Sequence, residues 1–460
     1  MNLLPFLSLA IGTLALEPIV IKNNSFIFEN SDERFYIRGV DYQPGGSSNL
    51  TDPLADVSIC KRDIPYFQEL GLNTIRVYSV DNTQDHTECM DLLADAGIYL
   101  IVDVNTPKTS ISRHNANCSY NVDYMTEVFA TIDSFANFTN TLGFFSANEL
   151  INEEEYFDLS PYIKAVTRDM KQYMRAQGYR TIPVGYAAAD VASIRYELAD
   201  YLNCGDDADA RIDMLGDNDY SWCGHSSFLV SGYEDKVKEY NGYSIPLFMS
   251  EYGCNQVAGG VRPFTEVSTI YSDLMSSVYS GGLVYQFFED TNHYGLVELN
   301  NDKISTMPDF DTLKNELNQT SNPTGNGGSK QYNFSACPTG LNFSLAVPPQ
   351  PAGLTDLIKN GPQGQNIGFD ATTQDSCDSD DNDDSWYSSI WDSTTTSSLT
   401  SSSASSESSS SLSTSTATIT TTSATVSSIS SNSKNDATGS LISFSNWVKF
   451  FSLFISLLTM

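Results

Sequence analysis

The chain has 460 residues and carries 24 Lys and Arg residues against 57 Asp and Glu residues, a formal net charge of −33. This charge argues against a nucleic-acid-binding protein, because a polyanion would meet a surface that repels it. Hydrophobic residues make up 40% of the chain, enough for a large buried core, and the length allows up to three domains.

The N-terminal segment 1–15 is apolar apart from Asn2, Ser8 and Thr13 and ends on the small residue Ala15. This pattern predicts a secretory signal peptide. The segment lacks a basic residue near its start, so a buried first strand is the alternative.

Between Leu16 and Val347, short apolar runs alternate with stretches long enough for helices. The expected strands are Phe35 to Tyr42, Thr74 to Tyr78, Tyr99 to Val104, Leu142 to Ala147, Thr181 to Tyr186, Met214 to Asn218, Ile245 to Ser250 and Gly282 to Phe287. Before the fifth strand, Ser160 is expected to cap a helix that begins at Pro161. Eight such repeats predict an α/β fold, a (β/α)8 TIM barrel over 16–347. A doubly wound open sheet is the alternative, but no Gly-x-Gly-x-x-Gly turn follows the first run.

Two glutamates directly follow expected strands. The fourth strand ends in Asn148 and Glu149, and the seventh is followed by Glu251. A barrel places the carboxyl ends of its strands around one mouth, where two opposed carboxyls can cleave a glycosidic bond. The adjacent Asn148 can donate a hydrogen bond to a sugar hydroxyl. Glu149 and Glu251 are therefore the candidate catalytic residues, although a single glutamate at a strand end is more often a solvated rim residue.

Other strand ends add polar and aromatic side chains to the same expected mouth. Sugar-binding clefts combine aromatic platforms with amides and carboxylates. The alternative for each tyrosine is core packing with a tethered hydroxyl. The candidates are Tyr42, Gln43, Arg76, Tyr78, Asp103, Asn218, Tyr220 and Tyr285.

The C-terminal quarter changes composition in three steps. An acidic transitional segment at 348–392 is expected either to wrap the domain or to be loose. From Ser393 to Ser433, 31 of 41 residues are Ser or Thr. This segment has too few apolar residues to form a core, so 393–434 is expected to be a disordered O-glycosylated stalk. The end, 435–460, resembles a GPI-anchor signal with Asn435 as the attachment residue and Gly439 as the second choice. A tail anchor is the alternative.

Glycosylation and cysteine patterns also favour the secretory pathway. The eight cysteines are an even number and can all pair as disulfides, which form in an oxidising compartment. No Cys-x-x-Cys or His-x-x-x-His spacing occurs, so we expect no metal site and no cofactor. Seven sequons predict N-glycans at Asn23, Asn49, Asn117, Asn137, Asn318, Asn333 and Asn342.

Several segments together resemble the fungal Gas/Gel/Phr family of GPI-anchored 1,3-β-glucanosyltransferases, glycoside hydrolase family 72, without its cysteine-rich glucan-binding module. The matching segments are Tyr42-Gln43, 76–81, 93–99, Asn148-Glu149, 222–224, 250–255 and 294–297. The resemblance implies a retaining cell-surface enzyme that cleaves β-1,3-glucan internally and transfers the new reducing end to an acceptor glucan. We expect the protein to be a monomer. It implies Glu149 as acid/base and Glu251 as nucleophile. It also implies donor-site contacts by Gln43, Tyr78, Asp103, Asn148, Tyr220 and Tyr285.

The resemblance further implies three disulfides, Cys60 with Cys89, Cys204 with Cys337 and Cys223 with Cys254, and leaves Cys118 and Cys377 as a fourth pair. Two departures stand out: Ala147 replaces a usual glycine, and Asp219 replaces an apolar residue before Tyr220. If the Asp219 side chain points inward, it could raise neighbouring pKa values. A degenerate relative that only binds glucan, or a hydrolytic endo-1,3-β-glucanase, is the alternative.

Overall fold

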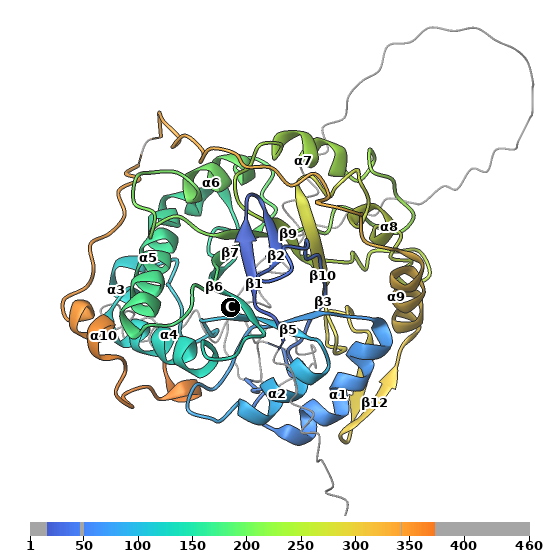
Figure 1. The fold of residues 1–460 in the computed structure, drawn as a ribbon, viewed down its shortest axis with the longest axis horizontal. Coiled ribbons are helices and arrows are strands. Elements are labelled where there is room, and N and C mark those ends of the chain that lie inside the picture. The colour runs from blue at the N-terminus through green and yellow to red at the C-terminus, as the bar shows by residue number, and fades with distance from the viewer. Residues whose placement is uncertain (1–15, 47–49, 342, 373–460) are drawn as a thin grey trace, which may run out of the picture. The chain divides into compact units, whose positions relative to one another are not determined.

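The computed structural model describes residues 16–46, 50–341 and 343–372. Eight parallel strands close into a barrel in the order β3, β4, β5, β6, β7, β8, β9 and β10, with β10 pairing back to β3 (Figure 1). This closed ring confirms the predicted (β/α)8 barrel. The expected signal peptide, the acidic segment beyond residue 372, the stalk and the anchor signal lie outside the described residues.

The barrel strands lie close to the predicted runs. They are β3 (Ile37–Asp41), β4 (Thr74–Val77), β5 (Tyr99–Asp103), β6 (Thr141–Asn148), β7 (Val184–Ala189), β8 (Met214–Asn218), β9 (Leu247–Tyr252) and β10 (Tyr279–Val284). The first residues of two predicted strands differ from the observed ones by three positions. The strand expected from Thr181 begins only after Pro183, and the strand expected from Gly282 begins at Tyr279. In both cases apolar residues continue beyond the paired backbone, so hydrophobicity alone misplaces the boundary.

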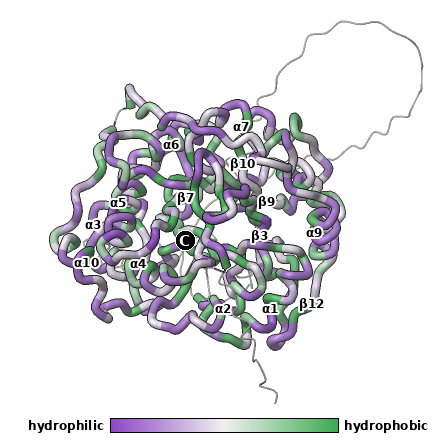
Figure 2. The backbone as a smooth tube through the Cα atoms, in the orientation of Figure 1, coloured by the Kyte–Doolittle hydropathy of each residue, from purple (hydrophilic) through white to green (hydrophobic). Residues whose placement is uncertain are grey.

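Helices cover the outside of the barrel. They are α1 (Val57–Leu70), α2 (Thr87–Asp95), α3 (Ala116–Ser119), α4 (Val122–Phe135), α5 (Ser160–Gln177), α6 (Arg195–Leu202), α7 (Tyr233–Glu239), α8 (Val267–Ile270), α9 (Pro308–Gln319) and α10 (Leu354–Asn360). Figure 2 shows hydrophobic residues on the inner strands β7 and β9, whereas α9 is mostly hydrophilic. No helix within the described residues is long and apolar enough to span a membrane.

The start of α5 differs from the expectation. A 3-10 helix, Glu154–Leu159, leads directly into α5, so Ser160 already has helical backbone angles and makes no capping hydrogen bond. Pro161 still occupies the first turn, where its missing N–H costs no helical hydrogen bond. The expected apolar face of α5 is buried, including Ile163, Val166 and Met170.

Two antiparallel hairpins flank the barrel. One consists of β1 (Ile19–Lys22) and β2 (Ser25–Phe28), the other of β11 (Val297–Asn300) and β12 (Lys303–Thr306). Ile19 and Phe26 of the first hairpin pack in one cluster with Tyr99 and Leu142, which lie at the beginnings of their strands. The N-terminal hairpin therefore closes the end of the barrel opposite the mouth.

The chain remains packed on the barrel after Val347, the expected end of the domain. Gln177 of α5 donates to the carbonyl of Ile358 in α10 (2.8 Å). Further on, the buried Glu127 of α4 accepts hydrogen bonds from the backbone N–H groups of Ile367 (2.8 Å) and Gly368 (3.1 Å). The segment 348–372 is thus a strap along the helical layer.

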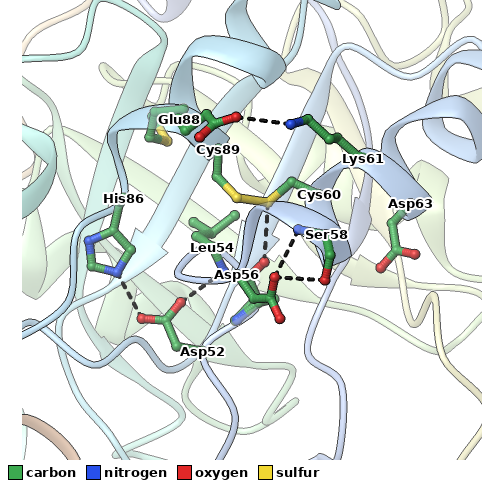
Figure 3. Close-up of a disulfide and its surroundings, with 12 residues drawn as sticks. Asp52, Leu54, Asp56, Ser58, Cys60, Lys61, Asp63, His86, Glu88 and Cys89 are labelled. Atoms are coloured by element: carbon green, nitrogen blue, oxygen red, sulfur yellow. Dashed lines mark hydrogen bonds and ion pairs between the residues drawn. A yellow bond between two sulfur atoms is a disulfide. The ribbon is translucent and has the colours of Figure 1, made fainter. Parts of the chain in front are cut away.

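The three implied disulfides are present: Cys60–Cys89, Cys204–Cys337 and Cys223–Cys254. Cys60–Cys89 joins α1 to α2, as Figure 3 shows, beside the contact of His86 Nε2 with Asp52 Oδ2 (2.8 Å). Cys377 lies outside the described residues, so its pairing with Cys118 stays a prediction.

The five predicted glycosylation sites within the described residues all have exposed side chains, which glycan attachment requires. They are Asn23, Asn117, Asn137, Asn318 and Asn333. Asn49 and Asn342 lie outside the described residues.

Candidate active site

Glu149 and Glu251 stand at the carboxyl ends of β6 and β9, and both are buried. Glu149 has a backbone φ of 46°, a left-handed conformation that is strained for a residue with a side chain. Hydrogen bonds hold this conformation from both sides. The Glu149 N–H donates to the carbonyl of Ala187 (2.8 Å), and the Arg113 guanidinium donates to the Glu149 carbonyl (2.5 Å).

Three donors surround the carboxylate of Glu251. The Tyr78 hydroxyl donates to Oε1 (2.8 Å), the Tyr220 hydroxyl donates to Oε2 (2.6 Å), and Arg76 Nη1 donates to Oε1 (3.3 Å). All three interactions favour the ionised form of Glu251.

The Glu149 carboxyl has a weaker set of partners. Asn218 Nδ2 donates to Glu149 Oε1 (2.8 Å), and the Ser250 hydroxyl donates to Asn218 Oδ1 (2.6 Å) and so fixes the orientation of the amide. A neutral amide stabilises a negative charge less than a guanidinium does. Of the two glutamates, Glu149 is therefore the one better suited to hold a proton.

The charge of Glu149 affects the ionisation of Glu251. Burial raises the pKa of Glu251 to about 7, with Arg76 opposing this shift and the charge of Glu149 adding to it. Burial also raises the pKa of Glu149, against the Asn218 hydrogen bond. When Glu149 holds a proton, its repulsion of Glu251 disappears. The pair can then carry one acid and one carboxylate at the same time.

Arg76 organises the charges below this pair. Its guanidinium is fully buried and binds Asp103 through two hydrogen bonds, Nε to Oδ1 (3.0 Å) and Nη2 to Oδ2 (2.9 Å). Nη2 also donates to Asn148 Oδ1 (3.0 Å). Asp41 lies 4.0 Å from Nη1, and burial raises its pKa well above the ordinary value although Arg76 opposes the shift. Arg76 therefore links Asp103 and Asn148 to Glu251.

Tyrosines form one wall of the mouth. The Tyr285 ring meets those of Tyr78, Tyr220 and Tyr294 edge to face, with centroid distances of 6.5, 6.2 and 5.3 Å. Such rings offer the apolar faces on which pyranose C–H groups can stack. The structure thus brings Tyr78, Tyr220 and Tyr285 together beside Glu251.

Two predicted positions have other surroundings. The expectation that Tyr42 lines the mouth is wrong: its hydroxyl donates to Asp63 of α1 (2.6 Å), and its ring packs against Phe67. Strand alternation turns Tyr42 outward into the helical layer. Gln43 is buried and ties two loops together, because its Nε2 donates to the Thr51 carbonyl (2.7 Å) and its Oε1 accepts from the Ser79 N–H (3.0 Å).

Asp219 points away from the mouth. Its carboxylate lies 2.6 Å from Lys236 Nζ on the outer side of the barrel. Burial opposes the charge of Asp219, but Lys236 outweighs it and leaves the Asp219 pKa lowered. The condition for the expected effect of Asp219 on neighbouring pKa values, an inward side chain, is therefore not met.

Sequence reasoning missed Asp41, Arg113 and Ser250. Asp41 directly precedes Tyr42, which points outward, so strand alternation could have suggested Asp41. Ser250 directly precedes Glu251, where alternation predicts the opposite side, so alternation did not suggest Ser250. Arg113 lies in a loop without a periodic pattern, so no sequence signal indicated it. Within the described parts of the chain, no group of His, Cys, Asp and Glu residues could hold a metal ion.

Comparisons with known proteins agree with this geometry. The glucanosyltransferase family model matches residues 9–321. The chain is 56% identical over 368 residues to the Saccharomyces cerevisiae 1,3-beta-glucanosyltransferase GAS5, covering 79% of this chain and 76% of that protein. It is 53% identical over 355 residues to the Aspergillus fumigatus 1,3-beta-glucanosyltransferase gel1, covering 75% and 77%.

A solved structure extends the comparison to the fold. Saccharomyces cerevisiae Gas2p in complex with laminaritriose and laminaritetraose superposes with a TM-score of 0.68 at 40% identity, covering 73% of this chain and 77% of that one. The chain therefore belongs to the glucanosyltransferase family, glycoside hydrolase family 72.

Proposed function

We propose that this chain is a retaining 1,3-β-glucanosyltransferase, which cleaves β-1,3-glucan internally and transfers the new reducing end to another glucan chain. The observation that carries the proposal is the unequal environment of two buried carboxyls. Glu251 receives three donors, among them a guanidinium, whereas Glu149 receives one amide. The activity named for the relatives supports the same assignment.

The first step forms a covalent glycosyl-enzyme. A Glu251 oxygen attacks the anomeric carbon of the donor sugar while the bond to the leaving glucan oxygen breaks. Glu149 gives its proton to that oxygen, so the departing chain leaves as a neutral alcohol. This mechanism requires the two carboxyl groups to be about 5 to 5.5 Å apart, because a wider separation would admit a water for direct displacement.

The second step transfers the sugar. Glu149, now ionised, removes the proton from an acceptor 3-hydroxyl, whose oxygen attacks the anomeric carbon and releases Glu251 as a carboxylate. Each step inverts the configuration at the anomeric carbon, so the two steps together retain it. Transfer exceeds hydrolysis only if the bound acceptor competes with water at about 55 M, which tight positioning of the acceptor hydroxyl can achieve.

We assign sugar contacts to the polar and aromatic groups that face the pair. Asn148 and Asn218 supply amide groups, and Tyr78, Tyr220 and Tyr285 supply hydroxyls and ring faces. Asp103 acts through Arg76, which it binds on two oxygens. Gln43 acts by fixing the loop after β3 to the loop after β4.

The test uses reduced laminari-oligosaccharides and chromatography of the products. The wild-type enzyme is expected to form products longer than the substrate. Glu149→Gln and Glu251→Gln are expected to lose several orders of magnitude of transfer with an unchanged melting temperature. Glu266→Gln is the matched control, because Glu266 is buried outside the mouth and burial raises its pKa to about 8. Near-wild-type transfer by either active-site variant would refute that residue's role.

The same assay separates the alternatives. Products that are only shorter than the substrate would indicate an endo-1,3-β-glucanase, and binding without any products would indicate an inactive glucan-binding relative. Both alternatives are compatible with intact Glu149 and Glu251, so the length of the products distinguishes them from a transferase.

We also propose that the protein is secreted and carries a GPI anchor at Asn435, at the outer face of the plasma membrane or in the cell wall, and functions as a monomer. The anchor signal at 435–460 lies outside the described residues. Release from membranes by a phosphatidylinositol-specific phospholipase is expected, and persistence of the peptide 447–460 in the mature protein would contradict it.

A further inference from the structure

The end of β8 connects the active site to a charged cluster outside the barrel. Asn218 and Tyr220 point inward and bind Glu149 and Glu251 (2.8 and 2.6 Å). Because side chains alternate along extended backbone, their neighbours Asp217 and Asp219 point to the opposite side. There both aspartates approach Lys236 of α7.

Lys236 is the centre of this cluster. Its Nζ lies 2.6 Å from Asp219 Oδ2, 2.7 Å from Asp190 Oδ2 and 3.8 Å from Asp217 Oδ2, and the residue is only 3% exposed. Arg195 binds the other oxygen of Asp190 (2.8 Å). Burial works against the charge of Lys236, yet the three carboxylates raise its pKa above the ordinary value. The ammonium is therefore a permanent cation between three acids.

Removal of this cation would change the backbone of residues 217–220. Arg195 would then be left to compensate Asp190, Asp217 and Asp219, and its ion pair is with Asp190. Buried carboxylates without a close cation are strongly unfavourable. The Tyr279 hydroxyl donates to Asp217 (3.0 Å), but a neutral phenol cannot replace an ammonium. Any outward displacement of the two aspartates must also displace the residues between and after them.

We propose that Lys236 is a positioning residue for the reaction. By binding Asp217 and Asp219, it fixes the tetrapeptide that places Asn218 against Glu149 and Tyr220 against Glu251. This inference rests on the proposed glucanosyltransferase function. Among the described residues, the ion pairs of Lys236 are with Asp190, Asp217 and Asp219 and not with either glutamate, so its effect passes through the backbone of β8.

The test compares Lys236→Met with Arg195→Met in the full-length protein. Lys236→Met is expected to lower kcat for transfer by about 10- to 150-fold, the range for a hydrogen bond to a charged group, while KM changes less than about threefold. Its pH profile is expected to move to higher pH, because both glutamates lose donors that stabilise their ionised forms. Lys236→Arg is expected to restore most of kcat and the wild-type profile.

Arg195→Met is the matched control. Arg195 belongs to the same cluster but its ion pair is with Asp190, so this variant is expected to lower the melting temperature and to leave kcat and the pH profile near wild type. The charged and titratable groups that face the two glutamates remain unchanged in all these variants; they are Asp41, Arg76, Tyr78, Asp103, Arg113, Tyr186, Tyr220, Tyr285 and Tyr294.

Three outcomes would overturn the inference: a folded Lys236→Met enzyme with wild-type kcat and pH profile, an Arg195→Met enzyme with the same pH shift, or a failed rescue by arginine. If Lys236→Met does not fold, Asp219→Asn decides, with an expected smaller shift in the same direction; an unshifted profile would refute the proposal. If the wild type shows no transfer, the proposed function fails instead. NMR titration of the Glu251 carboxyl in wild type and Lys236→Met then tests the positioning role by itself.

Discussion

Tyr220→Phe is expected to impair the enzyme more than Tyr78→Phe, although both changes remove one hydroxyl from Glu251. The Tyr220 hydroxyl is, among the described residues, the one side-chain donor to Glu251 Oε2 (2.6 Å). Oε1 receives Tyr78 (2.8 Å) and also Arg76 (3.3 Å). Tyr220→Phe therefore leaves one carboxylate oxygen without a donor, whereas Tyr78→Phe leaves Oε1 with a charged partner.

The magnitude follows from the kind of hydrogen bond that is lost. A hydrogen bond to a charged group contributes about 1.5 to 3 kcal/mol, which corresponds to about 10- to 150-fold in rate. We expect a loss of kcat/KM in this range for Tyr220→Phe and of less than about 10-fold for Tyr78→Phe. The acid limb of the pH profile is expected to move upward in Tyr220→Phe, because a donor that favours ionised Glu251 is gone.

The assay is initial-rate formation of elongated laminari-oligosaccharides between pH 4 and pH 8. Tyr173→Phe serves as a control for loss of a buried tyrosine hydroxyl, since Tyr173 of α5 donates to Asp133 of α4 in the helical layer (2.6 Å). An equal or larger loss in Tyr78→Phe, or an acid limb that stays in place in Tyr220→Phe, would show that the donors to Oε2 do not control the nucleophile.

Three further predictions concern pH, the longest disulfide and the strap. Transfer is expected to fall at high pH, because Glu149, whose pKa burial raises above the ordinary value, then loses the proton that it must give to the leaving oxygen; Glu149→Gln should abolish this basic limb in a pH–rate profile. Replacing Cys204 and Cys337 by alanine, which opens a loop with a sequence separation of 133, is expected to lower the free energy of unfolding by about 5 kcal/mol in the chain-entropy model, measured by urea unfolding; an unchanged midpoint would contradict it. Glu127→Ala should destabilise the strap by about 1 to 3 kcal/mol and speed limited proteolysis near residue 367, because two backbone N–H groups lose their acceptor; equal cleavage rates in both proteins would refute this.

The barrel and the centre of its active site could be predicted from the sequence because one geometric rule covers both. Parallel strands in a barrel present all their carboxyl ends at one mouth, so polar residues after apolar runs must meet there. Glu149 and Glu251 were found in this way, and the structure brings Tyr78, Tyr220 and Tyr285 beside Glu251.

The direction of individual side chains was harder to predict. The run from Phe35 to Tyr42 is buried on both faces, so hydrophobicity does not indicate which residues point inward. Tyr42 consequently belongs to the helical layer, whereas its neighbour Asp41 lies near Arg76 (4.0 Å). Arg113 could not be predicted at all, because its role depends on a loop that crosses to the Glu149 carbonyl.

Asp219 shows what the sequence at the end of a strand can and cannot indicate about side-chain contacts. Two aspartates on the outer face of one strand end require a cation from the covering helix, because that face is buried and the charges would otherwise lack compensation. Helix α7 offers Lys236 and Lys238, which the sequence alone does not distinguish. In the structure Lys236 is 3% exposed and bound to Asp219, whereas the Lys238 side chain is 61% exposed and pairs with Glu234 of its own helix (3.0 Å). The rotation of a short helix about its axis, set by the packing of Tyr233 into the core, thus decides which lysine can influence the catalytic pair.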